Sequence, residues 1–112
     1  MASDKTVDTE RFETQCFQIV AQVGSARSCY IEAISQAEKG DFEAARKLVQ
    51  EGDTDFNTGH AVHMELLQQE ADGIEMPFRI ILLHAEDQLM SAEAFRILAE
   101  RFINVYRHMY EQ

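Results

Sequence analysis

The stretch that decides the fold runs from Pro77 to Tyr110 and has the sequence PFRIILLHAEDQLMSAEAFRILAERFINVYRHMY. Residues recur in it at alternating steps of three and four, which is the repeat of an α-helix that packs on partner helices. Two such seams run side by side. The first comprises Ile81, His84, Gln88, Ser91, Phe95, Leu98, Phe102, Val105 and Met109. The second comprises Ile80, Leu83, Asp87, Met90, Ala94 and Ile97.

Further apolar residues of this stretch lie on another side, namely Leu82, Ala85, Leu89 and Ala92. The predicted helix is therefore apolar almost all round in its first half. Such a helix must be covered on every side, and two partner helices in one short chain cannot do so. The pattern predicts self-association, with this helix at the centre of an oligomer.

The rest of the chain predicts two more long helices. The first carries an unbroken heptad seam of Phe12, Cys16, Ile19, Val23, Ala26, Tyr30, Ala33 and Ala37. It ends at Gly40, which can take the left-handed conformation of a helix end, and Asp41 can cap the next helix. A second break precedes Pro77, which fits the first turn of the third helix. No segment alternates with period two, so we expect an all-α, antiparallel up-down-up three-helix bundle.

The second helix has a weaker seam, made of Phe42, Ala45, Val49, Phe56, His63 and Leu66. Gly52 and Gly59 lie inside it, seven residues apart. Each glycine costs about 1 kcal/mol relative to alanine in a helix. We therefore expect a neighbouring helix to pack against bare backbone at both positions.

Composition excludes several classes of function. Acidic residues outnumber basic ones by 20 to 10, which gives a net charge of −10 and argues against nucleic acid and anionic membrane surfaces as partners. Cys16 and Cys29 lie about 20 Å apart along one predicted helix, too far for a disulfide. No signal peptide or membrane span is visible, so we expect a cytoplasmic protein without membrane insertion. Residues 1–8 are polar and expected to be frayed, and residues 9–112 to form a single domain.

Two polar residues break the seams of the third helix. Asp87 falls in the middle of the second seam, where a buried carboxylate is costly unless a shared cation or a raised pKa neutralises it. The pattern alone equally allows Asp87 to be partly solvated. His84 belongs to the other seam, and a lone helical histidine is most often structural. His60 and His63 are three residues apart and could bind a metal, although two ligands make a weak site.

The segment 84–90, HAEDQLM, resembles a known signature. It is similar to the His-Ala/Gly-Gln-Asp-His-Leu-Met motif of the lactose/cellobiose-type (N,N'-diacetylchitobiose-type) enzyme IIA proteins of the bacterial phosphoenolpyruvate-dependent sugar phosphotransferase system. Segment 24–28, GSARS, resembles the Gly-x-Ala-Arg-Ser of that family, and segment 39–45, KGDFEAA, resembles its Gly-Asp-Phe-x-x-Ala. His60 also falls where the family commonly has a histidine. The resemblance extends without gaps from about residue 16 to residue 110.

The resemblance implies a fold, a reaction and partners. The family forms a trimeric nine-helix bundle from three-helix subunits. His84 matches its phosphoryl-accepting histidine, modified at the tele nitrogen. Asp87 matches its aspartate that binds a divalent cation, Mg²⁺, shared by three subunits. The implied function is that of a phosphotransferase component that takes a phosphoryl group from the histidine phosphocarrier protein. It passes the group to a cysteine of enzyme IIB, and the membrane enzyme IIC serves disaccharide uptake.

The signature departs from the family at two positions. Glu86 stands where glutamine is usual, and Gln88 where histidine is usual. With His60, these residues are candidates for supporting positions around His84. The departures can be tolerated variation, or they can indicate altered partner choice, slower transfer or a non-catalytic regulatory or scaffold paralogue. The sugar is not specified, because specificity in such a system lies mainly in the membrane component.

Overall fold

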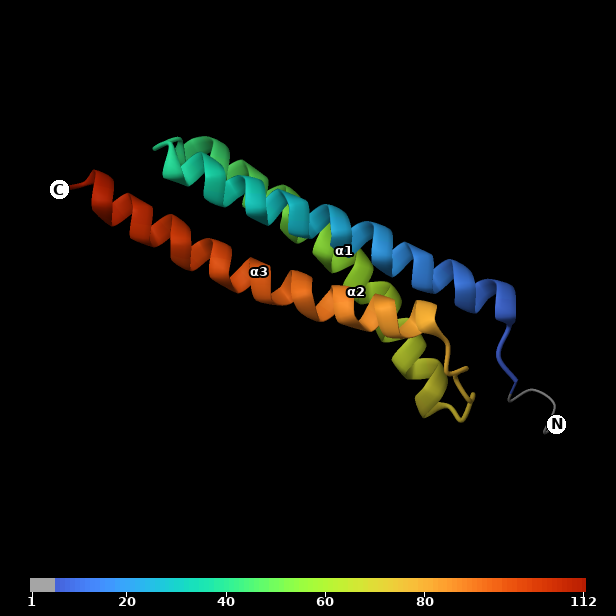
Figure 1. The fold of residues 1–112 in the computed structure, drawn as a ribbon. Helices are drawn as coiled ribbons and strands as arrows, with labels where there is room; N and C mark the ends of the chain where they lie inside the picture. Colours follow the sequence, from blue (N-terminus) through green and yellow to red (C-terminus); the bar gives the residue numbers. More distant parts are fainter. Residues whose placement is uncertain (1–5) are drawn as a thin grey trace.

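The computed structural model describes residues 6–112, which form three long helices. These are α1 (Thr9–Glu38), α2 (Phe42–Ala71) and α3 (Ile80–Tyr110). The chain runs up, down and up in a rod of 67 × 20 × 19 Å (Figure 1). The α1–α2 turn and the C-terminus lie at one end, and the α2–α3 connection lies at the other. The predicted all-α three-helix architecture is confirmed, and the described residues contain no strand.

The first two helix boundaries follow the sequence signals. Gly40 adopts a positive φ of 85° just after α1, and the Oδ1 atom of Asp41 accepts a hydrogen bond of 3.0 Å from the backbone N–H of Ala44. Of the eight residues expected to be frayed, residues 1–5 lie outside the described part. Val7 packs against the core, and Asp8 accepts a hydrogen bond from the backbone N–H of Arg11 to cap α1.

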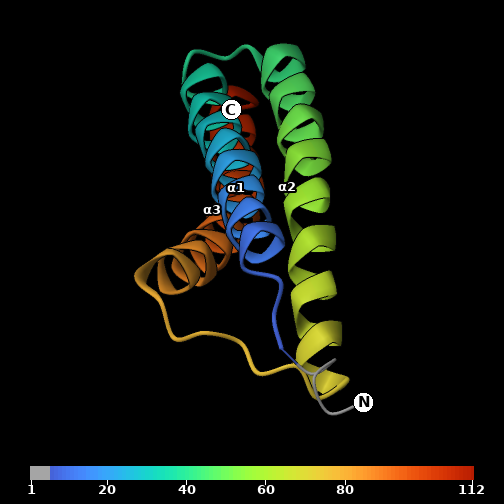
Figure 2. The same ribbon diagram turned by 90° about the vertical axis from the view of Figure 1, so that its right-hand side faces the viewer.

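The prediction that Pro77 occupies the first turn of the third helix is wrong. α3 begins at Ile80, and Arg79 before it is extended, with φ −125° and ψ 152° and no side-chain cap. Figure 2 shows the reason, since the connection from α2 to α3 crosses the end of the bundle as a loop. Proline also disfavours helical backbone in the residue before it, which suits Met76 to this extended crossing.

The core is organised around α1, which packs on α2 and on α3 more extensively than these pack on each other. All eight residues of its predicted seam are fully buried. α3 turns its small apolar stripe toward this core, namely Ala85, Leu89, Ala92, Ala99 and Ile103. α1 is therefore the central element, and α3 is covered on one side.

The two seams of α3 lie largely outside this core. Every residue of the second seam is exposed, including Ile80 at 84%, Leu83 at 48% and Met90 at 70%. The distal half of the first seam is exposed as well, at Leu98, Phe102, Val105 and Met109. This is the arrangement expected of a helix that one short chain cannot cover. No helix within residues 6–112 is long and apolar enough to cross a membrane.

Candidate functional site

His84 lies in the second turn of α3 and is exposed. Asp87 follows one turn later and is also exposed, and Gln88 is half-buried. Residues three and four apart share one face of a helix, so His84, Asp87 and Gln88 belong to the same side of α3. Among residues 6–112, no side chain is hydrogen-bonded to the imidazole of His84. The exposed imidazole is therefore accessible to an incoming group.

Glu86 faces α2. The Nε2–H of His63 donates to the Glu86 carboxylate, with distances of 2.7 Å to Oε1 and 2.9 Å to Oε2. Two residues correspond to about 200° around a helix, so Glu86 and His84 leave α3 in nearly opposite directions. The negative charge of Glu86 is thus directed to His63 and away from His84. His63 was predicted as a seam residue of the second helix, and nothing in the sequence indicated this contact.

His60 is exposed, and its ring stacks on that of Phe56 with a centroid distance of 5.9 Å. The structure therefore brings His60 to an aromatic ring of its own helix. Within the described chain, no three His, Cys, Asp or Glu side chains gather closely enough to hold a metal ion. A metal at Asp87 would accordingly need ligands from other chains or from water.

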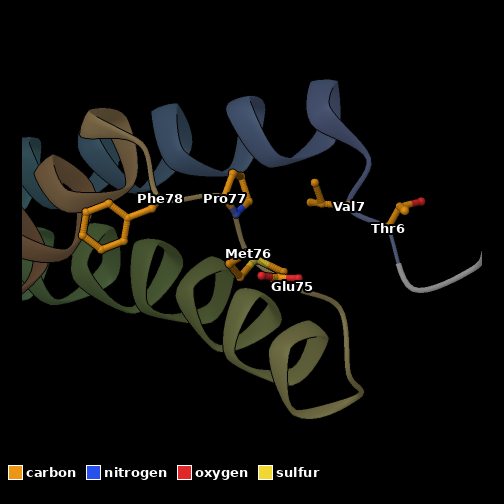
Figure 3. A pocket seen from close by; sticks show the side chains of 6 residues that line it. All are labelled: Thr6, Val7, Glu75, Met76, Pro77 and Phe78. Carbon is orange, nitrogen blue, oxygen red and sulfur yellow. The ribbon is translucent and has the colours of Figure 1, made fainter.

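A hollow of about 430 Å³ opens between the N-terminal segment and the α2–α3 connection (Figure 3). It is lined by Thr6, Val7, Glu75, Met76, Pro77 and Phe78. Neither His84 nor Asp87 lines it. The candidate residues thus lie on an open helix face, which suits contact with another protein better than enclosure of a small molecule.

Comparison with known sequences decides the family. Residues 14–107 match the sequence profile of the family described as "PTS system, Lactose/Cellobiose specific IIA subunit". The chain belongs to this family. It is a lactose/cellobiose-type IIA component of the sugar phosphotransferase system, as the signature at 84–90 suggested, and the matched segment contains His84, Glu86 and Asp87.

Individual IIA relatives cover almost the whole chain. The lichenan-specific phosphotransferase enzyme IIA component of Bacillus subtilis (strain 168) is 36% identical over 103 residues, which is 92% of this chain and 94% of the relative. The lactose-specific EIIA component of Lacticaseibacillus casei is 41% identical over 75 residues, 67% of each chain. The crystal structure of the cellobiose-specific enzyme IIA from Bacillus anthracis superposes with a TM-score of 0.88 at 32% identity, covering 90% of this chain and 93% of that one. The IIA fold is therefore shared over nearly the full length.

Proposed function

We propose that this IIA component is a phosphocarrier that accepts a phosphoryl group on His84 from the histidine phosphocarrier protein. It then passes the group to the cysteine of a lactose/cellobiose-type enzyme IIB, for disaccharide uptake. The observation that carries the proposal is the exposure of His84 on α3, within a segment that matches the IIA family. An exposed imidazole on a regular helix can be approached by two different proteins in turn.

The chemistry suits an imidazole. The unprotonated nitrogen of neutral His84 forms a new N–P bond while the N–P bond of the donor breaks, and the donor ring keeps the electron pair. In the second transfer a thiolate of enzyme IIB forms an S–P bond, and the electron pair of the breaking N–P bond returns to His84. Phosphoryl transfer depends mainly on in-line positioning and on hydrogen-bond donors around the phosphoryl oxygens, which a docked partner can supply.

The exposed second seam supports a further part of the proposal, a homotrimer with α3 at its centre. Leu83, Met90 and Ile97 form an apolar stripe, and Asp87 lies among them. Further copies of the chain would cover the stripe, which large exposed apolar patches generally require.

Asp87 is suited to a divalent cation in such a trimer. A carboxylate oxygen is the kind of ligand that Mg²⁺ prefers, usually with several waters retained. Three copies of Asp87 meeting near one another would repel unless a cation neutralised them. Bound there, the cation would supply charge neutralisation to the assembly, and the Asp87 side chains would hold it.

A second candidate function is a non-catalytic regulatory or scaffold paralogue of the same fold. The departures at Glu86 and Gln88 favour it, because they remove an amide and a titratable ring from the signature. Incubation with phosphoenolpyruvate and the general phosphotransferase proteins separates the two functions. A carrier acquires acid-labile, base-stable phosphate that is absent from a His84→Ala variant, whereas a non-catalytic paralogue acquires none.

A further inference from the structure

We propose that His63 and Glu86 form a positioning pair that ties the second turn of α3 to α2 and so sets the orientation of His84. This inference rests on the proposed function of His84. The pair joins two helices through one N–H that both carboxylate oxygens accept, at 2.7 and 2.9 Å. Because both oxygens are engaged, the carboxylate is fixed in rotation as well as in distance.

The surroundings make this contact stronger than an ordinary surface pair. The side chain of His63 is 13% exposed and that of Glu86 is 40% exposed. Partial removal from water strengthens a hydrogen bond to a carboxylate, whereas fully exposed pairs contribute little. His63 also lies on the half-buried side of α2, so its ring has little freedom to follow a moving partner.

The start of α3 needs such a contact. Arg79 makes no side-chain cap, and Figure 2 shows α3 beginning apart from α2. Besides the apolar packing of Ile81 and Leu82, two polar side-chain pairs among residues 6–112 attach this part of the helix. Arg79 reaches Glu13 of α1 at 3.1 Å, and Glu86 reaches His63 of α2 at 2.7 Å. His84 lies between these two attachment points in the sequence.

Fixing Glu86 fixes the rotation of the helix segment that carries His84. The two side chains leave α3 in nearly opposite directions, so a carboxylate held on α2 keeps the imidazole turned outward. A rotated or frayed first turn would move the imidazole from the line of the incoming phosphoryl group. Misplacement by about 1 Å can slow a positioned reaction on the order of a hundredfold.

The test measures phosphoryl transfer from the phosphorylated histidine phosphocarrier protein to variants of the full chain. Glu86→Ala and His63→Ala are each expected to lower kcat about tenfold with a change in KM below about threefold, because docking is retained and positioning is lost. The double variant should be no slower than either single one. Glu86→Gln should restore kcat, because its amide oxygen still accepts the His63 N–H.

Glu43→Ala is the matched control. It removes another pair of 2.7 Å, Arg46–Glu43, which lies within α2 near the opposite end of the rod, and it should leave kcat unchanged. The proposal is overturned if both alanine variants stay within about twofold of wild type, if Glu86→Gln is as slow as Glu86→Ala, or if Glu43→Ala is equally slow.

Hydrogen exchange of the backbone amides of residues 82–88 separates this inference from the proposed function. Faster exchange in Glu86→Ala and His63→Ala, and not in Glu86→Gln, supports the holding of α3 by the pair. Unchanged exchange in the alanine variants overturns it. If the wild-type chain takes up no phosphate, the proposed function fails by itself, and the exchange experiment still decides whether the pair holds the helix.

Discussion

Tyr30 of α1 lies directly against the backbone of Gly52 of α2. A Cβ atom at residue 52 would lie 2.7 Å from Cε1 of Tyr30. The ring cannot move aside easily, because it is fully buried and its hydroxyl donates a 2.6 Å hydrogen bond to Oδ1 of Asp53. Gly59 of α2 is packed just as closely against α1, since a Cβ there would lie 2.7 Å from Cγ1 of Val23. The close approach of α1 and α2 thus depends on both glycines.

Gly52→Ala should therefore destabilise the fold. Overpacking of a tight contact costs about 1–3 kcal/mol, and a 2.7 Å approach to a fixed ring belongs in the upper part of this range, above the gain of about 1 kcal/mol in helix propensity. Gly24→Ala is the matched control, because a Cβ there meets nothing within 4 Å, and it should stabilise by up to about 1 kcal/mol. Urea unfolding of both variants measures the difference, and a shift of the same sign in both would contradict this packing.

The buried Tyr30 hydroxyl predicts a loss of stability at alkaline pH. Burial, and then the hydrogen bond to Asp53, raises the pKa of Tyr30 well above its usual value. Above about pH 10 the unfolded chain loses this proton while the folded chain keeps it, so stability falls by up to about 1.4 kcal/mol per pH unit. The stability that the protonated Tyr30 hydroxyl contributes is fully present below about pH 10.

Tyr30→Phe should remove the part of the stability loss above about pH 10 that Tyr30 causes. At neutral pH it should lower the free energy of unfolding by about 1 kcal/mol, because the hydrogen bond to Asp53 is lost. Urea midpoints measured from neutral to alkaline pH provide the test. Tyr110→Phe, which alters an exposed tyrosine, is the control. A decline as steep in Tyr30→Phe as in wild type would show that Tyr30 does not cause it.

The helices and the α1 core were predictable because both depend on local periodicity. A seam such as Phe12 to Ala37 in α1 can be recognised without knowledge of its partners, and all of it is buried. The cross-helix pairs were not predictable. Whether His63 meets Glu86, or Tyr30 meets Asp53, depends on the rotation and offset of two helices, and many surface charges could pair equally well in the sequence. The break at Pro77 was predicted, but its geometry depended on the distance to be crossed.

The exposed seam of α3 predicts where the proposed trimer forms. Leu83→Glu should break the assembly, because it places a charge in the apolar stripe that further copies of the chain would cover. Leu67→Glu on α2 is the control, since Leu67 is 44% exposed and Leu83 48%, yet Leu67 lies outside both seams. Light scattering at micromolar concentration should give a trimer for wild type and Leu67→Glu and a smaller species for Leu83→Glu. A monomeric wild type would contradict the proposal.

Removal of the cation tests the role of Asp87. If a divalent cation binds the folded assembly, a chelator should lower the thermal midpoint, because bound ligand stabilises the folded form by about 2.7 kcal/mol at a hundredfold excess over Kd. Asp87→Asn should abolish this sensitivity. Glu93→Gln, at an exposed residue of α3 outside both seams, should keep it. An equal chelator effect in wild type and Asp87→Asn would place the cation elsewhere.

The proposed function requires that His84 carries the phosphoryl group. The most direct measurement locates the phosphate after incubation of the chain with phosphoenolpyruvate, the general phosphotransferase proteins and the histidine phosphocarrier protein. Mass spectrometry under alkaline conditions, which preserve phosphohistidine, should find one phosphoryl group per chain, on His84. The His84→Ala variant should take up none. Phosphate that persists in His84→Ala, or that maps to His60, His63 or His108 in the wild-type chain, would contradict the account.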